Sequence, residues 1–257
     1  MADPDYVAVN REGWTQANAE YTDRQAEGAW AQEETTWGKW SIPERDLRVL
    51  PDLAGKEVVE LGCGTGYFGA WLKRAGAQRV VGVDVTPAQL ETARRMNEQH
   101  GLGLEFVEAN AEETGLPADS FDFAFSEYGA SIWCDPAKWI PEAARLLRTE
   151  GELVFLRGST LQILCSPDTG PVVEQLVRPQ QGLYKLEWYD DEPGVEFHPP
   201  VSEMHRILRE SGFELLDFRE LYAPENARDH EYYDTVPAAW AKRWPDEEIW
   251  RLRLRPR

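Results

Sequence analysis

Between positions 58 and 72 the chain reads VVELGCGTGYFGAWL, in which an acidic residue is followed by glycines at every second position. The β-branched residues before Glu60 predict a short buried strand, and the apolar spacing after the glycines predicts a helix. Gly62, Gly64 and Gly66 remove side chains where the backbone must turn tightly, and the start of the helix presents free N–H groups. The stretch therefore predicts a binding site for a nucleotide or a nucleoside.

The glycine spacing is compatible with two classes of ligand. Gly64, Gly66 and Gly69 also spell GxGxxG, the pattern of dinucleotide-binding turns. In either class, Asp84 at the end of the next strand could bind ribose hydroxyls. Glu60 distinguishes between the two classes of ligand, because a carboxylate directed into the site would repel a pyrophosphate but would pair with an ammonium group. We therefore expect a ligand in which adenosine is joined to an amino acid, and a dinucleotide remains the alternative.

The elements that position these residues alternate between strand-like and helix-like runs over Val58–Leu156, the pattern of a doubly wound parallel sheet. Five strands are expected, at EVVEL, RVVGVDV, LEFVEAN, SFDFAFSE and GELVFLRG. Pro87 starts a helix that runs to about His100, and Asp135 opens the helix before the fifth strand. Further on, SEMHRILRESG indicates a helix, FELLDFREL another strand, and the alternation in EIWRLRLRPR a last strand with an arginine-rich face.

Two regions lie outside this core. An aromatic N-terminal arm spans 1–50, and within it Ser41 and Glu44 are spaced as a capping box for a helix that leads into the sheet. An insertion spans 158–201 and is rich in turn signals. Its acidic residues are interpreted as a solvated charge run, with attraction of a cationic small molecule as the alternative. These acidic residues are Glu187, Asp190, Asp191, Glu192 and Glu196.

Length and charge limit the classes of function. The 257 residues carry 27 Lys plus Arg against 46 Asp plus Glu, a net charge of -19, which disfavours binding to nucleic acid or to an anionic membrane. No apolar run approaches the roughly 20 residues that span a bilayer, and the N-terminus lacks a signal-peptide pattern, so we expect a cytoplasmic protein. The three cysteines have no metal-binding or disulfide spacing, and no metal is expected.

Taken together, these motifs resemble those of the class I S-adenosylmethionine-dependent methyltransferases. ELGCGTG is similar to the family's glycine motif, Asp84 stands at its ribose-binding position, and NAEE, LPADSFDFAFS and AARLLRTEGELVFL follow in the family's order over about 47–157. The resemblance implies a Rossmann-like, mostly parallel seven-stranded sheet with helices on both faces. It implies one domain over 1–257, with 51–157 binding S-adenosylmethionine, the insertion covering the substrate, and 202–257 completing the sheet.

The resemblance also assigns roles. The glycine motif and Asp84 contact the cofactor. Val85 packs on the adenine, the side chain of Asn110 accepts a hydrogen bond from the adenine amino group, and Ala111 and Glu112 flank the ring. Ser126 faces the methionine part of the cofactor, and Tyr21 and Trp37 of the aromatic arm are predicted to cover the cofactor. The complete predicted cofactor set is Tyr21, Trp37, Glu60, Gly62, Cys63, Gly64, Gly66, Asp84, Val85, Asn110, Ala111, Glu112 and Ser126.

The implied reaction is methyl transfer to an O, N or C nucleophile of a small molecule. Because a sulfonium is already a strong methyl donor, catalysis can rest on placing the acceptor in line and excluding water. Glu127, Tyr128 or His198 is expected to orient or deprotonate the acceptor. A catalytically silent S-adenosylmethionine-binding regulatory protein and a dinucleotide-dependent oxidoreductase are the alternatives.

Overall fold

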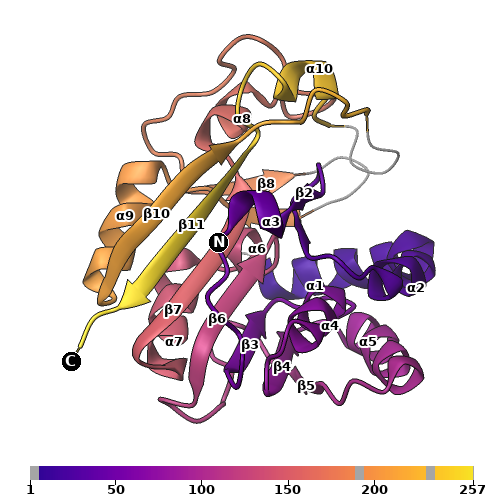
Figure 1. The fold of residues 1–257 in the computed structure, drawn as a ribbon. Helices are drawn as coiled ribbons and strands as arrows, with labels where there is room; N and C mark the ends of the chain where they lie inside the picture. Colours follow the sequence, from indigo (N-terminus) through magenta and orange to yellow (C-terminus); the bar gives the residue numbers. More distant parts are fainter. Residues whose placement is uncertain (1–5, 189–193, 230–234, 257) are drawn as a thin grey trace.

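The computed structural model describes residues 6–188, 194–229 and 235–256 of the chain. At its centre is a seven-stranded sheet in the order β10-β11-β7-β6-β3-β4-β5 (Figure 1). The strands from β3 to β7 are parallel to their neighbours within this set, whereas β11 is antiparallel to both β7 and β10. The predicted Rossmann-like α/β fold is confirmed. The strands are β3 (Glu57–Leu61), β4 (Arg79–Asp84), β5 (Glu105–Glu108), β6 (Phe121–Glu127), β7 (Leu147–Gly158), β10 (Phe213–Leu221) and β11 (Glu247–Leu254).

Helices cover both faces of the sheet (Figure 1). One face is covered by α4 (Tyr67–Arg74) and α5 (Pro87–His100), and the other by α7 (Pro136–Leu146) and α9 (Val201–Glu210). The predicted start and end of α5 are confirmed. Asp135 caps α7 as expected, since its carboxylate accepts a 2.9 Å hydrogen bond from the backbone N–H of Ala137.

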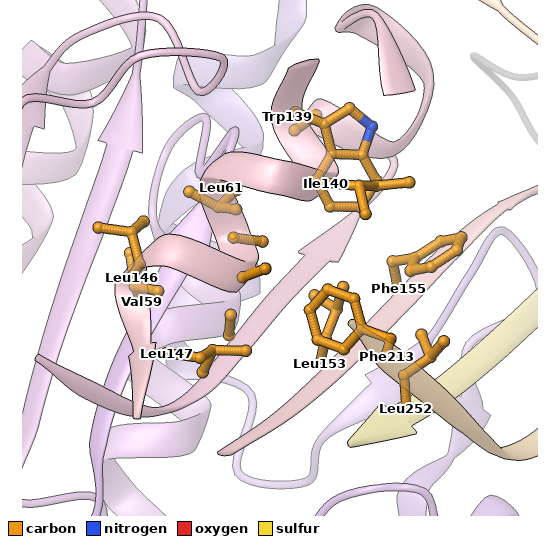
Figure 2. Close-up of a cluster of buried hydrophobic side chains, with 14 of the residues drawn as sticks. Val59, Leu61, Trp139, Ile140, Leu146, Leu147, Leu153, Phe155, Phe213 and Leu252 are labelled. Atoms are coloured by element: carbon orange, nitrogen blue, oxygen red, sulfur yellow. The ribbon is translucent and has the colours of Figure 1, made fainter. Parts of the chain in front are cut away.

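The core under α7 joins this helix to the middle of the sheet (Figure 2). Trp139 and Ile140 of α7 pack against Leu153 and Phe155 of β7. The ring of Phe155 lies 5.4 Å from Trp139 in an edge contact and 5.8 Å from Trp250 in a stacked contact, measured between ring centroids. Phe155 therefore connects the helix layer to the antiparallel strand β11.

The N-terminal arm lies over the face that α4 and α5 cover. In it, α2 packs on α4 and α5, and the indole N–H of Trp30 donates to the backbone carbonyl of Thr65 at 2.8 Å. Because Thr65 belongs to the glycine-rich turn, the arm is attached directly to the predicted ligand site. The elements of the arm are α1 (Tyr6–Ala17), η1 (Asn18–Thr22), α2 (Asp23–Ala31), β1 (Thr36–Trp37), β2 (Ile42–Pro43) and α3 (Glu44–Leu47).

The predicted capping box at the end of the arm is wrong. Ser41 adopts a left-handed backbone with φ 49°, and α3 begins only at Glu44, after Pro43. The Glu44 carboxylate instead accepts hydrogen bonds from the indole of Trp37 at 2.7 Å and from the backbone N–H of Leu50 at 2.8 Å. The acid therefore holds an aromatic side chain and the next loop rather than a helix start.

The insertion contains α8 (Thr160–Cys165), β8 (Lys185–Trp188) and β9 (Gly194–Phe197), and α10 (Ala238–Ala241) follows later in the chain. Of its acidic residues, Asp190, Asp191 and Glu192 lie outside the described residues. The prediction that these acids form a solvated charge run is wrong for Glu196. Its carboxylate lies 2.6 Å from the imidazole of His198 in a largely buried pair.

The arginine-rich face of β11 is covered by acids from both neighbouring strands. Arg251 pairs with Glu152 of β7 at 2.8 Å, and Arg253 lies 3.8 Å from Glu152 and 3.7 Å from Glu214 of β10. The apolar residues between these arginines are buried in the core. The predicted terminal strand is therefore confirmed, with ion pairs on its polar face.

Among the residues that the structure describes, no helix has both the length and the apolar character needed to cross a lipid bilayer.

Replacing Phe155 with alanine is expected to destabilise the fold strongly. The ring is fully buried between two tryptophans, so its removal loses transfer free energy and leaves a cavity, together about 3–5 kcal/mol in the free energy of unfolding. Urea denaturation of F155A and of the matched control L176A, at an exposed leucine, measures this. Equal stabilities of the two variants would contradict the packing described here.

Candidate active site

The predicted ligand site lies where the carboxyl ends of β3, β4 and β6 meet at one edge of the sheet. In open α/β sheets, ligands bind outside these ends. The turn after β3 is fixed to β4 by hydrogen bonds from the backbone N–H groups of Gly62 and Cys63 to the carbonyl of Val83, at 2.8 and 3.0 Å. Gly66 in turn donates to the carbonyl of Cys63 at 2.8 Å. The glycine turn is therefore held in place on both sides before any ligand binds.

Each of the three motif glycines has a backbone conformation that favours glycine, with φ 78°, 52° and 75° for Gly62, Gly64 and Gly66. Their surroundings differ. A Cβ on Gly62 would lie 2.6 Å from the backbone of Ala130, whereas a Cβ on Gly64 would meet only the side chain of Gln89, at 3.6 Å. The turn is therefore packed against α6 (Ala130–Trp133) at Gly62 and open at Gly64.

Asp84 joins the glycine turn to the start of α5. One carboxylate oxygen accepts from the backbone N–H of Gly64 and the other from that of Thr86, both at 2.8 Å. Burial raises the pKa of Asp84, although these backbone donors oppose the shift. The next residue, Val85, is half-buried beside it. This arrangement leaves the remaining acceptor positions of the carboxylate for a ligand at the open side of the turn.

Glu60 is buried behind the same turn, with 4% of its surface exposed. Its carboxylate accepts a 3.1 Å hydrogen bond from the backbone N–H of Gly69, so it points toward the first turns of α4. Burial is the main cause that raises its pKa well above the ordinary value, and the neighbouring carboxylates of Glu127 and Asp84 raise it further. Both of these acids therefore act on Glu60.

Glu127 and Tyr128 end β6 at this edge. The Glu127 carboxylate accepts from the backbone N–H of Gly38 at 3.1 Å and from the hydroxyl of Tyr67 at 3.4 Å, and burial raises its pKa to about 7. Tyr128 has a left-handed backbone with φ 53°, and its hydroxyl donates to Glu247 at 2.7 Å. The end of β6 thus contacts both the arm and β11.

A second pair of acids at this edge, Asp246 and Glu247, was not predicted from the sequence. Asp246 lies 3.0 Å from the ammonium of Lys39 and accepts from the indole of Trp40 at 2.9 Å, and Glu247 accepts from the backbone N–H of Lys39 at 2.8 Å. Burial raises the pKa of Glu247 to about 7. In the sequence these acids look like a surface charge run before the last strand, and only the arm folding over them buries them.

The side chains predicted around the adenine and the methionine part already have protein partners. The amide oxygen of Asn110 accepts from the backbone N–H of Glu112 at 3.0 Å, and the Glu112 carboxylate accepts from the hydroxyl of Tyr6 at 2.7 Å. The hydroxyl of Ser126 donates to the carbonyl of Leu61 at 2.7 Å. The buried Ala111 offers only its backbone and a methyl group. These contacts hold the loops together, so their predicted ligand roles remain predictions.

The two arm residues predicted to cover the cofactor are both buried. Tyr21 belongs to η1, whose Thr22 hydroxyl accepts from the side chain of Gln89 at 3.2 Å, close to the open side of the glycine turn. Trp37 packs on Phe68 of α4 with 4.7 Å between ring centroids. The arm is thus attached at the glycine turn, but the contacts of Trp37 are with the core.

His198 lies in the insertion, on β9's C-terminal side, rather than at the end of β6. It is 2% exposed, and one ring nitrogen lies 2.6 Å from the Glu196 carboxylate. Burial lowers the pKa of His198, and the nearby guanidinium groups of Arg157 and Arg178 lower it further. Of the three predicted catalytic residues, Glu127 and Tyr128 are therefore adjacent, and His198 belongs to a separate polar cluster.

The buried thiol of Cys63 lies against Gly82 of β4, and burial raises the pKa of this thiol well above the ordinary value. Within the described ranges, no group of three or more His, Cys, Asp or Glu side chains could hold a metal ion.

Comparisons with known proteins agree with this geometry. A family model for a methyltransferase domain matches residues 59–155. A crystal structure of an S-adenosylmethionine-dependent methyltransferase from Mesorhizobium loti has a TM-score of 0.64 and 25% sequence identity, covering 81% of this chain and 96% of that one. Residues 59–155 therefore form a methyltransferase domain of the class I S-adenosylmethionine-dependent type. The resemblance that the sequence motifs predict is confirmed.

Two curated relatives of this methyltransferase domain are demethylmenaquinone methyltransferases. The one from Thermus thermophilus is 38% identical over 119 residues, which are 46% of this chain and 53% of that protein. The one from Clavibacter sepedonicus is 28% identical over 184 residues, which are 68% of this chain and 73% of that protein. The first of these matches thus spans about half of its relative's length.

Alanine at Gly62 is expected to disrupt the methyltransferase domain more than alanine at Gly64. Both glycines have left-handed backbones, which cost an alanine about 1–2 kcal/mol. Only at Gly62 does the added Cβ also collide with the backbone of α6, so G62A should lose several kcal/mol more in the free energy of unfolding. Chemical denaturation of both variants measures the difference, and equal losses would refute the packing argument.

The stability of the domain is expected to depend on pH through Glu127. Its pKa is about 7 in the folded chain against an ordinary value of 4.5, so the folded state holds an extra proton between these values. Stability contributed by the protonated carboxyl is therefore lost as the pH rises through this window, by roughly 3 kcal/mol. E127Q, which mimics the protonated form, should lack this part of the pH dependence.

Urea denaturation of wild type and E127Q at pH 5, 6, 7 and 8 tests this, with E98Q on the exposed face of α5 as the matched control. The expected result is a stability difference between E127Q and wild type that grows with pH and is absent for E98Q. Parallel pH profiles for all three proteins would show that Glu127 keeps its ordinary pKa.

Proposed function

We propose that this protein is a cytoplasmic enzyme that transfers the methyl group of S-adenosylmethionine to an O, N or C nucleophile of a small molecule. The observation that carries the proposal is the Asp84 carboxylate, which two backbone N–H groups hold beside a glycine turn that is open at Gly64. Such a site suits a nucleoside whose ribose diol lies at this carboxylate. The match of residues 59–155 to a methyltransferase domain favours S-adenosylmethionine over a dinucleotide as that ligand.

The fit of the cofactor rests on the turn and on Asp84. Gly64 leaves open space where a ligand can approach the backbone, and the Asp84 carboxylate beside it has the acceptor positions that a ribose diol needs. Val85 offers half-buried apolar surface for the adenine. Glu60 then acts through the position of the turn and of α4, because its carboxyl group is directed to the backbone N–H of Gly69.

Bound S-adenosylmethionine supplies an activated methyl group, so the protein's own residues have to bind, orient and protect the acceptor. Glu127 is the favoured proton acceptor, because a carboxyl with a pKa of about 7 can take a proton near neutral pH. Tyr128 is a positioning residue whose hydroxyl is held by Glu247. The arm contacts Glu127 through Gly38 and contacts Glu247, the partner of Tyr128, through Lys39, and these contacts help to exclude water.

Two observations support a small-molecule acceptor. The related proteins from Thermus thermophilus and Clavibacter sepedonicus are named for methylation of demethylmenaquinone, a small molecule. The net charge of -19 disfavours nucleic acid as the acceptor.

The asparagine variant of Asp84 is expected to weaken cofactor binding. D84N keeps an acceptor oxygen for one backbone N–H but loses the negative charge and the second acceptor, so affinity for S-adenosylmethionine and S-adenosylhomocysteine should fall at least about tenfold. Isothermal titration calorimetry of wild type and D84N with both compounds and with NAD measures this.

Measurable binding of the two sulfur nucleosides, without binding of NAD, is the expected result. Tight binding of NAD alone would overturn the proposal in favour of an oxidoreductase. Cofactor binding without methyl transfer from radiolabelled S-adenosylmethionine to any pool of candidate quinols, phenols and amines would favour the silent regulatory protein. E98Q serves as the control for nonspecific effects of removing an acid.

A further inference from the structure

An uninterrupted helical run joins the insertion to the candidate cofactor site. The run consists of α1, η1 and α2, and the residues that flank η1 on both sides keep a helical backbone. Helix α1 lies against β9 of the insertion, η1 lies against α5, and α2 lies against α4 and α5. The N-terminal arm is therefore in contact with the insertion and with the helices around the glycine turn at the same time.

Asn10 attaches this run to β9. The side chain is 5% exposed, its Oδ1 accepts from the backbone N–H of Val195, and its Nδ2 donates to the Val195 carbonyl, both at 2.8 Å. Nδ2 also donates to the carbonyl of Trp133 in α6 at 3.3 Å. Among the described strands, β9 pairs with β8 alone, so both backbone groups of Val195 depend on Asn10 for their hydrogen bonds.

Other contacts fix β9 to α1 and to α6. The hydroxyl of Tyr6 donates to Glu112 in the loop after β5, and its ring makes an edge contact with Phe197 of β9 at 5.1 Å between centroids. A Cβ on Gly194 would lie 2.9 Å from the ring of Trp133, so β9 approaches α6 as closely as a glycine permits. The docked α1 therefore sets the position of β9.

The middle of the same run lies at the open side of the glycine turn. The hydroxyl of Thr22 accepts from the side chain of Gln89 at 3.2 Å, and the amide oxygen of Gln89 is the nearest atom to a Cβ placed on Gly64. A nucleoside at this open side contacts the docked arm as well as the turn. These additional contacts favour the docked arm over an undocked one, and the shift is as large as the difference in affinity for the two arrangements.

We propose that Asn10 is a positioning residue that couples the two sites, so that nucleoside binding at the glycine turn fixes the position of β9. Because the insertion is predicted to cover the acceptor, the coupling makes the cofactor bind before the acceptor. The inference rests on the proposed binding of S-adenosylmethionine. Coupling is reciprocal, so the loss of the Asn10 contacts also weakens nucleoside binding by the same factor.

Hydrogen exchange at the backbone amide of His198 reports the coupling, because this N–H donates to the carbonyl of Tyr184 at 2.6 Å and not to Asn10. The exchange rate is measured with and without saturating S-adenosylhomocysteine in wild type, N10L and N97L. Leucine has the branching of asparagine but no hydrogen-bonding group. N97L is the matched control, because Asn97 binds both backbone groups of Leu104 in the same way but joins α5 to the loop before β5.

S-adenosylhomocysteine is expected to slow this exchange by at least about fivefold in wild type and in N97L, and to leave it unchanged in N10L. Calorimetric titration should show an affinity for S-adenosylhomocysteine that is about fivefold lower in N10L than in N97L. A purely structural role of Asn10 would change the exchange rate by the same factor with and without the ligand.

The inference is overturned if the ligand slows the exchange equally in N10L and in N97L. It is also overturned if wild type binds S-adenosylhomocysteine without any change at His198, a result that leaves the methyltransferase proposal intact. Absence of S-adenosylhomocysteine binding to wild type overturns both proposals, so the two failures are distinguished by the same titration.

Discussion

The burial of carboxylates at one edge of the sheet is the constraint on which the rest of the site depends. A buried acid is tolerated only when it is protonated or hydrogen-bonded, and here each one is held by backbone N–H groups from a neighbouring element. Glu60 fixes α4 through Gly69, and Asp84 fixes the glycine turn and the start of α5. The acids thereby position the turn that the motif glycines make possible.

The arm follows from the same constraint. Without the backbone N–H groups of Gly38 and Lys39, Glu127 and Glu247 would each keep only a tyrosine hydroxyl as a hydrogen-bond donor. A Cβ on Gly38 would lie 2.3 Å from the Glu247 carboxylate, so the hairpin approaches the acids as closely as a glycine permits. The contacts that close the site are therefore the same contacts that provide hydrogen bonds to its buried acids. A change in the protonation of either acid alters how firmly the arm is held.

Local patterns predicted the sheet, its helices and the cofactor motif, because they are encoded by short-range periodicity and by glycine spacing. Strand β10 and the helix α5 have the expected bounds for this reason. The partners of Asp246 and Arg157 were not predictable, since each depends on contacts between segments far apart in the chain. For the same reason, Glu196 was interpreted as a surface charge although the insertion buries it against His198.

The two faces of the sheet hold different buried polar groups at the edge of the candidate active site. Side chains alternate along a strand, so Leu156 and Arg157 leave β7 on opposite faces, and Leu156 packs in the same cluster as Phe125 on the Glu127 side of β6. Arg157 therefore faces the insertion, where the Glu248 carboxylate and the carbonyl of Pro199 hold it, whereas Glu127 faces the arm. Each face of the sheet thus binds its neighbouring segment through a different buried polar group of the same strand pair, so the contact with the arm and the contact with the insertion do not share a side chain.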